Sequence, residues 1–163
     1  MWWRLPRGGK LWEQSKGEKN KRAFQKLVKN GDVSGCLAFA NHDPVGWCCV
    51  GRRGDFPRLE RTKALKTDWS PGTWSVTCFY IKSAWRRHGV ATLLLKEAVK
   101  LARKNGAAEL EAYPVRPTSG SDIPAAFAWT GVPKLFAACS FQNVTPSGNA
   151  RDVYIRRFRT RGL

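Results

Sequence analysis

The sequence predicts an α/β sandwich in which helices flank a mixed β-sheet. Helix-like and strand-like segments alternate in the order helix, hairpin, strand, helix, strand, helix, hairpin, which is typical of that fold class. The 163 residues suit a single domain, 1–163, because domains commonly have roughly 100–200 residues. A hydrophobic share of 42%, with 8 Trp and 8 Phe, can fill a core. We expect a helical N-terminal part at 1–32 and the core at 33–158.

The composition argues against several classes of protein. No segment approaches the ~20 uncharged apolar residues that cross a bilayer, and the first residues lack the apolar run of a secretory signal. A soluble, cytoplasmic protein without a membrane partner is therefore expected. The 5 cysteines include no Cys-x-x-Cys, so we expect reduced core thiols and no metal. The two histidines, His42 and His88, lie in no zinc or Ser-His-Asp motif.

Apolar spacing predicts the elements of the first half of the chain. A helix is expected over 19–28, stopped by Asn30-Gly31, and its apolar stripe is Ala23, Phe24, Leu27 and Val28. Strand-like runs at 36–40 and 45–50 predict a hairpin, and its turn is Asn41-His42-Asp43-Pro44. A long polar connector follows at 51–73. Within it, Asp55 is expected to cap a short helix over 55–61.

The second half begins with an uncharged run, 74–81, which predicts a strand covered on both faces. The clearest amphipathic helix follows and ends at Asn105-Gly106. Its apolar residues keep a spacing of three to four, and they are Val90, Leu93, Leu94, Ala98, Leu101 and Ala102. A strand at 108–115 and a helix at 132–139 come next. Two final strands are expected near 141–144 and 151–158.

The turn between the 74–81 strand and this helix carries the most informative chemistry; its sequence is Arg86-Arg87-His88-Gly89-Val90-Ala91-Thr92. The first N–H groups of a helix have no intrahelical partner and carry the positive end of its dipole. Gly89 and Ala91 leave the backbone open, and the arginines attract anions, so the turn suits a diphosphate. An ordinary strand–helix turn with solvated arginines explains these residues about as well, because the spacing matches neither a P-loop nor Gly-x-Gly-x-x-Gly.

Three segments resemble one known family. Arg86-x-x-Gly89-x-Ala91 is similar to the Gln/Arg-x-x-Gly-x-Gly/Ala signature of the GNAT superfamily of N-acetyltransferases. The segment Leu135-Phe136-Ala137-Ala138-Cys139-Ser140-Phe141 resembles the end of that family's last helix, and Pro44-Val45-Gly46-Trp47 resembles its second and third strands. The resemblance covers about 33–158. It implies a mixed, mostly antiparallel, twisted sheet flanked by helices.

The resemblance also implies a cosubstrate and a reaction. Acetyl-CoA would lie between two central strands, with its pantetheine arm on the backbone of Phe79 and Ile81 and its pyrophosphate on the amides of 87–92. The cofactor-binding residues are thus Phe79, Tyr80, Ile81, Arg86, Arg87, His88, Gly89, Val90, Ala91 and Thr92. A primary amine, on a small molecule or a peptide, would attack the thioester directly in a ternary complex. The chain would act as a monomer or a homodimer.

Two departures from the family bear on catalysis. A Tyr often protonates the leaving thiolate from the last helix, but Phe136 stands at the matching place, and Ser140 stands where Gly is usual. Tyr113 is the candidate acid instead, although a core tyrosine explains it at least as well. No convincing strand precedes Val33, so the family's first strand is expected to be missing, with Trp2 and Trp3 packing in its place.

The candidate general base is Glu111, which shares strand parity with Glu109 and Tyr113. It could serve as the base if that face of the strand looks into the cleft. A solvated strand face is the alternative, and it is the simpler one. Further acidic candidates in the connector are Asp55 and Glu60.

The charge leaves a second function open. Lys and Arg number 29 and Asp and Glu 12, which gives a net charge of +17, more than one polyanionic cofactor needs. The excess would favour an anionic acceptor or nucleic acid, and it argues mildly against free polyamines. The alternative function is therefore a non-catalytic, basic nucleic-acid-binding module.

Overall fold

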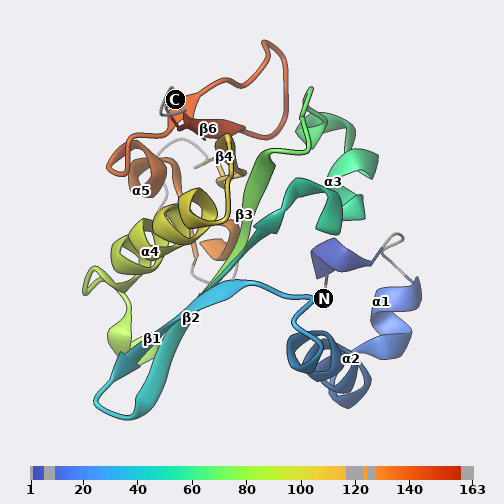
Figure 1. The fold of residues 1–163 in the computed structure, drawn as a ribbon, viewed down its shortest axis with the longest axis vertical. Coiled ribbons are helices and arrows are strands. Elements are labelled where there is room, and N and C mark those ends of the chain that lie inside the picture. The colour runs from blue at the N-terminus through green and yellow to red at the C-terminus, as the bar shows by residue number, and fades with distance from the viewer. Residues whose placement is uncertain (1, 6–9, 117–122, 125–127, 159–163) are drawn as a thin grey trace.

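The computed structural model describes residues 2–5, 10–116, 123–124 and 128–158 (Figure 1). The described residues form one six-stranded sheet in the order β1-β2-β3-β4-β6-β5. The strands are β1 (Gly35–Ala40), β2 (Asp43–Arg52), β3 (Thr73–Ile81), β4 (Glu109–Ala112), β5 (Gln142–Asn143) and β6 (Tyr154–Arg157). The α-helices are α1 (Lys10–Ser15), α2 (Glu18–Lys29), α3 (Pro57–Arg61), α4 (Val90–Lys104) and α5 (Pro133–Ala137). Short 3-10 turns are η1 (Trp2–Arg4), η2 (Arg53–Asp55), η3 (Lys63–Leu65), η4 (Ser83–Trp85) and η5 (Ala128–Thr130).

The sheet is mixed and mostly antiparallel, which confirms the predicted fold class. Strands β3 and β4 pair in parallel, and every other neighbouring pair is antiparallel. The parallel pair requires a crossover, and α4 supplies it. Figure 1 shows α4 and α5 on one side of the sheet and α1, α2 and α3 on the other.

Helix α4 packs on the sheet through an entirely apolar buried face. Its buried residues recur every three or four positions, and they are Val90, Leu94, Leu95, Ala98, Val99 and Ala102. They join side chains of the central strands and of α5 in one hydrophobic cluster. The helix begins after Gly89 and ends before Asn105, close to the bounds that its sequence predicts.

A second cluster lies on the side of the N-terminal segments. Its buried members are Trp3, Cys49, Phe56, Leu59, Leu65, Tyr113, Val153 and Ile155, with Trp2, Trp47, Cys78 and Trp129 packed against them. The connector contributes to this cluster through α3 and η3. The predicted long connector is thus a folded cover for this side of the sheet.

Three local predictions need correction. Helix α2 buries Asn20 and partly buries Phe24 and Leu27, whereas Ala23 and Val28 are exposed, so the apolar stripe is narrower than predicted. Helix α3 is preceded by Phe56, not capped by Asp55, because Pro57 occupies the first turn and sets the start. The turn of the first hairpin is Asn41-His42 alone, since the residues predicted to complete it begin β2.

The cysteines and the helices bear on disulfides, a metal site and a membrane span. All five cysteines are free thiols, and Cys48, Cys49 and Cys139 are buried. Burial raises the pKa of the Cys48 thiol well above its usual value, so this thiol stays protonated. Among the described residues, no helix is long and apolar enough to span a membrane, and no three His, Cys, Asp or Glu side chains gather as a metal site.

Candidate active site

The two central strands separate halfway along the sheet. Strand β4 pairs with β3 from Glu109 opposite Thr73 to Ala112 opposite Val76, and there β4 ends. Strand β3 continues to Ile81, and its pairing with β2 skips Thr77 in a bulge. The strand predicted at 108–115 is therefore shorter than expected, because its pairing with β3 stops at the separation. The segment 77–81 of β3 thus extends past its β4 neighbour.

The turn at 86–92 lies directly after this extended segment. Arg86 Nε donates to the carbonyl oxygen of Ile81 at 3.0 Å, and His88 Nδ1 lies 2.7 Å from the carbonyl oxygen of Arg86. Gly89 precedes α4 with φ +79°, in the left-handed region that glycine tolerates best. No side chain caps the helix there, and a Cβ built on Gly89 would meet no atom within 4 Å. The start of α4 therefore presents backbone donors beside open space.

A cavity of about 560 Å³ lies on the opposite side of β3 from α4, and we name it the aromatic cavity. It is lined by Trp2, Trp3, Arg4, Trp12, Phe24, Trp47, Cys49, Phe56, Thr77, Cys78, Phe79, Tyr80 and Trp129. Its volume falls in the range of roughly 300–1,000 Å³ that is typical of small-molecule sites. One wall is the part of β3 that extends past β4.

Stacking contacts hold the walls of the aromatic cavity. The rings of Trp2 and Trp12 meet edge to face at 5.3 Å, and the Arg58 guanidinium carbon lies 3.4 Å from the centre of the Trp2 ring. The rings of Trp3 and Trp129 are 5.5 Å apart. On the far wall, Phe24 of α2 meets Trp47 of β2 edge to face at 5.7 Å. Residues of six elements, η1, α1, α2, β2, α3 and η5, therefore contact one another around the cavity.

Several buried polar atoms of the residues that line this cavity have no hydrogen-bond partner. They are Trp3 Nε1, Arg4 Nε, Arg4 Nη2 and Thr77 Oγ1. The Arg4 side chain is 10% exposed, and only its Nη1 approaches a carboxylate, with Asp55 Oδ2 at 4.0 Å. A buried donor without a partner costs free energy, so most are paired in folded proteins. Here the four atoms belong to residues that line one cavity, although none of the four has surface open to it.

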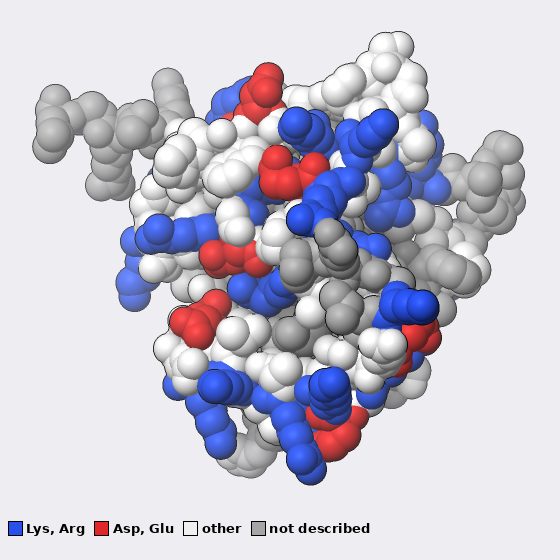
Figure 2. All heavy atoms as spheres, turned by 90° about the vertical axis from the view of Figure 1, so that its right-hand side faces the viewer, with Lys and Arg blue, Asp and Glu red and all other residues white. Residues whose placement is uncertain are grey.

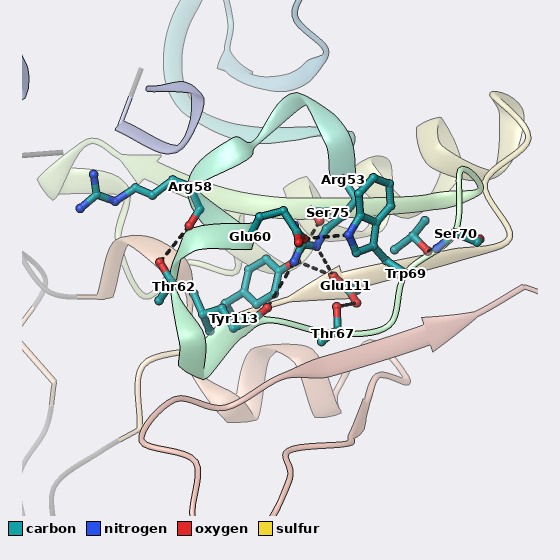
Figure 3. A network of polar contacts seen from close by, with 12 residues as sticks. Arg53, Arg58, Glu60, Thr62, Thr67, Trp69, Ser70, Ser75, Glu111 and Tyr113 are labelled. Atoms are coloured by element: carbon teal, nitrogen blue, oxygen red, sulfur yellow. Dashed lines mark hydrogen bonds and ion pairs between the residues drawn. The ribbon is translucent and has the colours of Figure 1, made fainter. Parts of the chain in front are cut away.

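Tyr113 of the second cluster belongs to a buried polar network (Figure 3). Arg53 Nε donates to Glu111 Oε2 at 2.9 Å, and both side chains are fully buried. Glu111 also accepts from Thr67 Oγ1 at 2.7 Å and from the Tyr113 hydroxyl at 2.6 Å. The Tyr113 hydroxyl lies 2.9 Å from Ser75 Oγ. The connector thus supplies both Arg53 and Thr67 to the carboxylate of Glu111.

This network places the two predicted catalytic residues side by side. Burial, and secondarily the charge of Glu111, raises the pKa of Tyr113 well above its usual value, so the phenol stays protonated. Neither residue lines the aromatic cavity, although the Tyr113 ring lies 6.4 Å from that of Trp3. The alternative prediction, that Glu111 lies on a solvated strand face, is wrong. Connector residues Arg53 and Thr67 cover the Glu111 side chain, which is fully buried.

The remaining predicted residues lie apart from this pair. Glu60 lies 3.0 Å from Arg53 Nη1 and accepts from Trp69 Nε1, and Asp55 lies near Arg4. Phe136 is fully buried against Phe79, on the α4 side of the sheet. The sequence did not predict the aromatic cavity, since its walls come together only in the fold.

A family model and several solved structures match this chain. The model of the acetyltransferase (GNAT) family matches residues 2–119. No curated protein matches the chain significantly.

Solved structures share the fold at low sequence identity. The ribosomal-protein-alanine N-acetyltransferase from Brucella melitensis aligns with a TM-score of 0.55 and 14% identity over 86% of this chain and 78% of that one. The PaiA N-acetyltransferase from Thermoplasma acidophilum, solved with coenzyme A, aligns at 0.57 and 17% over 91% and 75%. The yncA protein from Salmonella typhimurium, solved with its cofactor acetyl-CoA, aligns at 0.57 and 13% over 90% and 78%.

These structures agree with the mixed sheet flanked by helices. At identities this low, the similarity to these structures shows a shared fold and nothing further. The family match, residues 2–119, includes η1, β3, the 86–92 turn and β4. Because it covers well over half of the sequence, this chain belongs to the GNAT family of acetyltransferases.

Proposed function

We propose that the protein transfers an acetyl group from acetyl-CoA to a primary amine, by direct attack in a ternary complex. One observation carries the proposal: the segment 77–81 of β3 joins the aromatic cavity to the 86–92 turn. Its residues Thr77, Cys78, Phe79 and Tyr80 line the cavity, and its last residue, Ile81, is bonded to Arg86 of the turn. A thioester carried along this segment would place its acetyl group at the cavity.

The chain offers two kinds of backbone donor to the cosubstrate. The edge of β3 beyond Val76 would pair with the pantetheine arm as an added strand does, and the start of α4 would hold the pyrophosphate. The residues from Phe79 to Ile81 and from Arg86 to Thr92 are the proposed cofactor-binding set. The charge of +17 would draw polyanionic coenzyme A toward the site. Figure 2 shows Lys and Arg over much of the face that carries α1, α2 and α3.

The reaction itself needs proximity and two proton movements. The amine nitrogen forms a bond to the thioester carbon, the carbon–sulfur bond breaks, and the thiolate takes a proton. Only a neutral amine can attack. An apolar cavity that also holds the positive charge of Arg4 disfavours an ammonium ion, so it lowers the pKa of the bound amine.

Tyr113 is the proposed acid and Glu111 the proposed base, joined by the 2.6 Å hydrogen bond. Through that bond, a proton that Glu111 takes from the amine replaces the one that Tyr113 gives to the thiolate. The pair then returns to its starting state after each turnover. Both side chains are buried, so the exchange with substrate has to run through a water molecule at the parting of β3 and β4.

Gly89→Glu tests the cosubstrate site, and the chain offers a matched control. Gly89 and Gly106 lie at opposite ends of α4, with φ +79° and +78° and open space around each. Glu at either position carries similar backbone strain, about 1 kcal/mol. We expect Gly89→Glu to abolish the rise in Tm that coenzyme A causes, because it adds bulk and negative charge where the pyrophosphate would bind. Gly106→Glu should keep that rise.

Equal loss in both variants, or in neither, would contradict the cosubstrate site. The same titration with RNA tests the alternative of a nucleic-acid-binding module. RNA binding through the basic surface would fall steeply with salt, whereas binding of coenzyme A at a specific site should weaken modestly. Stabilisation by RNA alone would favour the alternative.

A further inference from the structure

The wall of the aromatic cavity consists mainly of rings. Of the thirteen described residues that line it, nine are Trp, Phe or Tyr, and these include five of the eight tryptophans of the chain. The buried polar atoms of Trp3, Arg4 and Thr77 that lack a partner have no surface open to this space. The surface that an occupant would contact is therefore mostly apolar.

The same wall contains no partner for a charged occupant. Among the described residues that line the cavity, none is Asp, Glu or His, and the one charged residue is Arg4. Its Nη1 lies 4.0 Å from Asp55 Oδ2, and its guanidinium carbon lies 4.8 Å from the centre of the Phe56 ring. A carboxylate or a second ammonium on the occupant would leave water without a partner, which costs free energy. The part of the occupant inside the cavity should thus be uncharged.

The cavity reaches the surface beside β3. Tyr80 is 56% exposed and Trp12 is half-buried, whereas Trp3 and Phe56 are buried, so the lining residues extend from the surface into the interior. The β3 wall belongs to the segment 77–81, along which the thioester is proposed to lie. An amine at this wall, with its substituent among the indoles, would therefore meet the acetyl group.

The shape of the lining favours an aromatic substituent. The indoles of Trp2 and Trp12 meet edge to face at 5.3 Å, and those of Trp3 and Trp129 are 5.5 Å apart. A flat ring buried among them leaves water and gains edge and face contacts that a saturated ring makes less well.

We propose that the acceptor is an arylalkylamine, a primary amine on a short alkyl chain that ends in an uncharged aromatic ring. The inference rests on the proposed acetyl transfer and names the substrate class for it. The amine nitrogen bonds to the acetyl carbon, the carbon–sulfur bond breaks, and the proton that the amine loses is balanced by one that the thiolate gains. The products are the N-acetyl arylalkylamine and free coenzyme A.

The first test compares four amines on the wild-type protein, by calorimetric titration with coenzyme A present. We expect phenethylamine to bind most tightly. L-Phenylalanine, which adds only a carboxylate, and spermidine, which adds further ammonium groups, should bind at least about 10-fold more weakly, because the wall holds no partner for either charge. 2-Cyclohexylethylamine, which lacks only the aromatic character, should bind roughly 2- to 5-fold more weakly.

The second test removes one ring from the wall. Trp12→Leu keeps an apolar side chain, and we expect it to raise the Kd of phenethylamine roughly 3- to 10-fold. Trp85→Leu is the matched control, because Trp85 of η4 is 40% exposed and does not line the aromatic cavity. It should leave that Kd unchanged. Melting curves show whether each variant is folded, and the comparison of amines on the wild type does not depend on them.

Each contrary outcome overturns one specific claim. Equal affinity for phenethylamine and L-phenylalanine, or tighter binding of spermidine, would overturn the uncharged class, and equal affinity for 2-cyclohexylethylamine would overturn the aromatic one. Equal losses in Trp12→Leu and Trp85→Leu would mean that the ring binds outside the aromatic cavity. If phenethylamine binds but releases no thiol from acetyl-CoA, the proposed acetyl transfer fails and the ring site stands. If other amines release thiol and phenethylamine does not, the acceptor class fails alone.

Discussion

Helix α4 and the N-terminal segments cover opposite sides of the same sheet, and they fill the space above it differently. On the α4 side every buried helix residue is apolar, and the cluster includes residues such as Leu95 and Ala98 that are completely buried. On the other side, fully buried Arg53 and Glu111 form an ion pair, and a cavity of about 560 Å³ is present. Apolar side chains pack closely on one side, whereas the other side contains a cavity and unpaired donors.

The difference separates what stabilises this protein from what it offers to a ligand. Burial of apolar surface drives folding, whereas a buried charge or an unpaired donor costs free energy unless something compensates it. Apolar packing on the α4 side therefore stabilises the fold, whereas the buried charges and unpaired donors on the other side lower its stability. Local departures from good packing are expected at functional sites, and here they gather on one side of β3.

Removing Glu111 should have the largest effect on stability. Glu111→Ala leaves the charge of Arg53 buried with one remaining carboxylate, that of Glu60, and breaking such pairs costs about 3–5 kcal/mol. Urea unfolding measures this loss. Glu97→Ala is the control, because its pair with Lys100 is exposed and contributes at most about 0.5 kcal/mol. A loss no larger than that of the control would show that Glu111 is not held as a buried charge.

Truncating the α4 side should lower the stability of the fold. Leu95 is fully buried, so Leu95→Ala should lower the free energy of unfolding by about 3 kcal/mol. Leu93 is 61% exposed on the same helix, and Leu93→Ala should change it by less than about 0.5 kcal/mol. Urea unfolding measures both losses. An equal loss in the two variants would contradict the packing of Leu95 in the core.

The smallest effect, and the sharpest contrast, comes from two threonines of β3. Thr73 Oγ1 donates to Glu109 Oε1 at 2.9 Å and accepts from the Ser70 N–H group at 3.1 Å, whereas buried Thr77 Oγ1 has no partner. Thr73→Val should lower the free energy of unfolding by about 1–2 kcal/mol, and Thr77→Val should leave it unchanged or slightly higher. Thermal unfolding of both variants checks this. An equal loss would mean that the Thr77 hydroxyl is paired in the free protein.

Much of the fold follows from local patterns in the sequence. The spacing of apolar residues predicts α4 almost to the residue, and Asn105-Gly106 marks its end. The uncharged run at 74–81 predicts β3 and its burial on both faces. The partial length of β4 was not predictable, because it depends on where β3, 36 residues earlier in the register (Val76 opposite Ala112), stops pairing and not on its own composition.

Sequence alone determined the helices, the strand order along the chain and the glycine at the start of α4, because periodicity and turn chemistry act between neighbours. Strand parity placed Glu111 and Tyr113 on one face, but only the tertiary structure decided that Arg53, 58 residues away, covers that face. The same holds for the meeting of Trp3, Arg4 and Thr77 around one cavity. Contacts between distant segments depend on how whole elements pack against one another, and local sequence patterns contain no information on that packing.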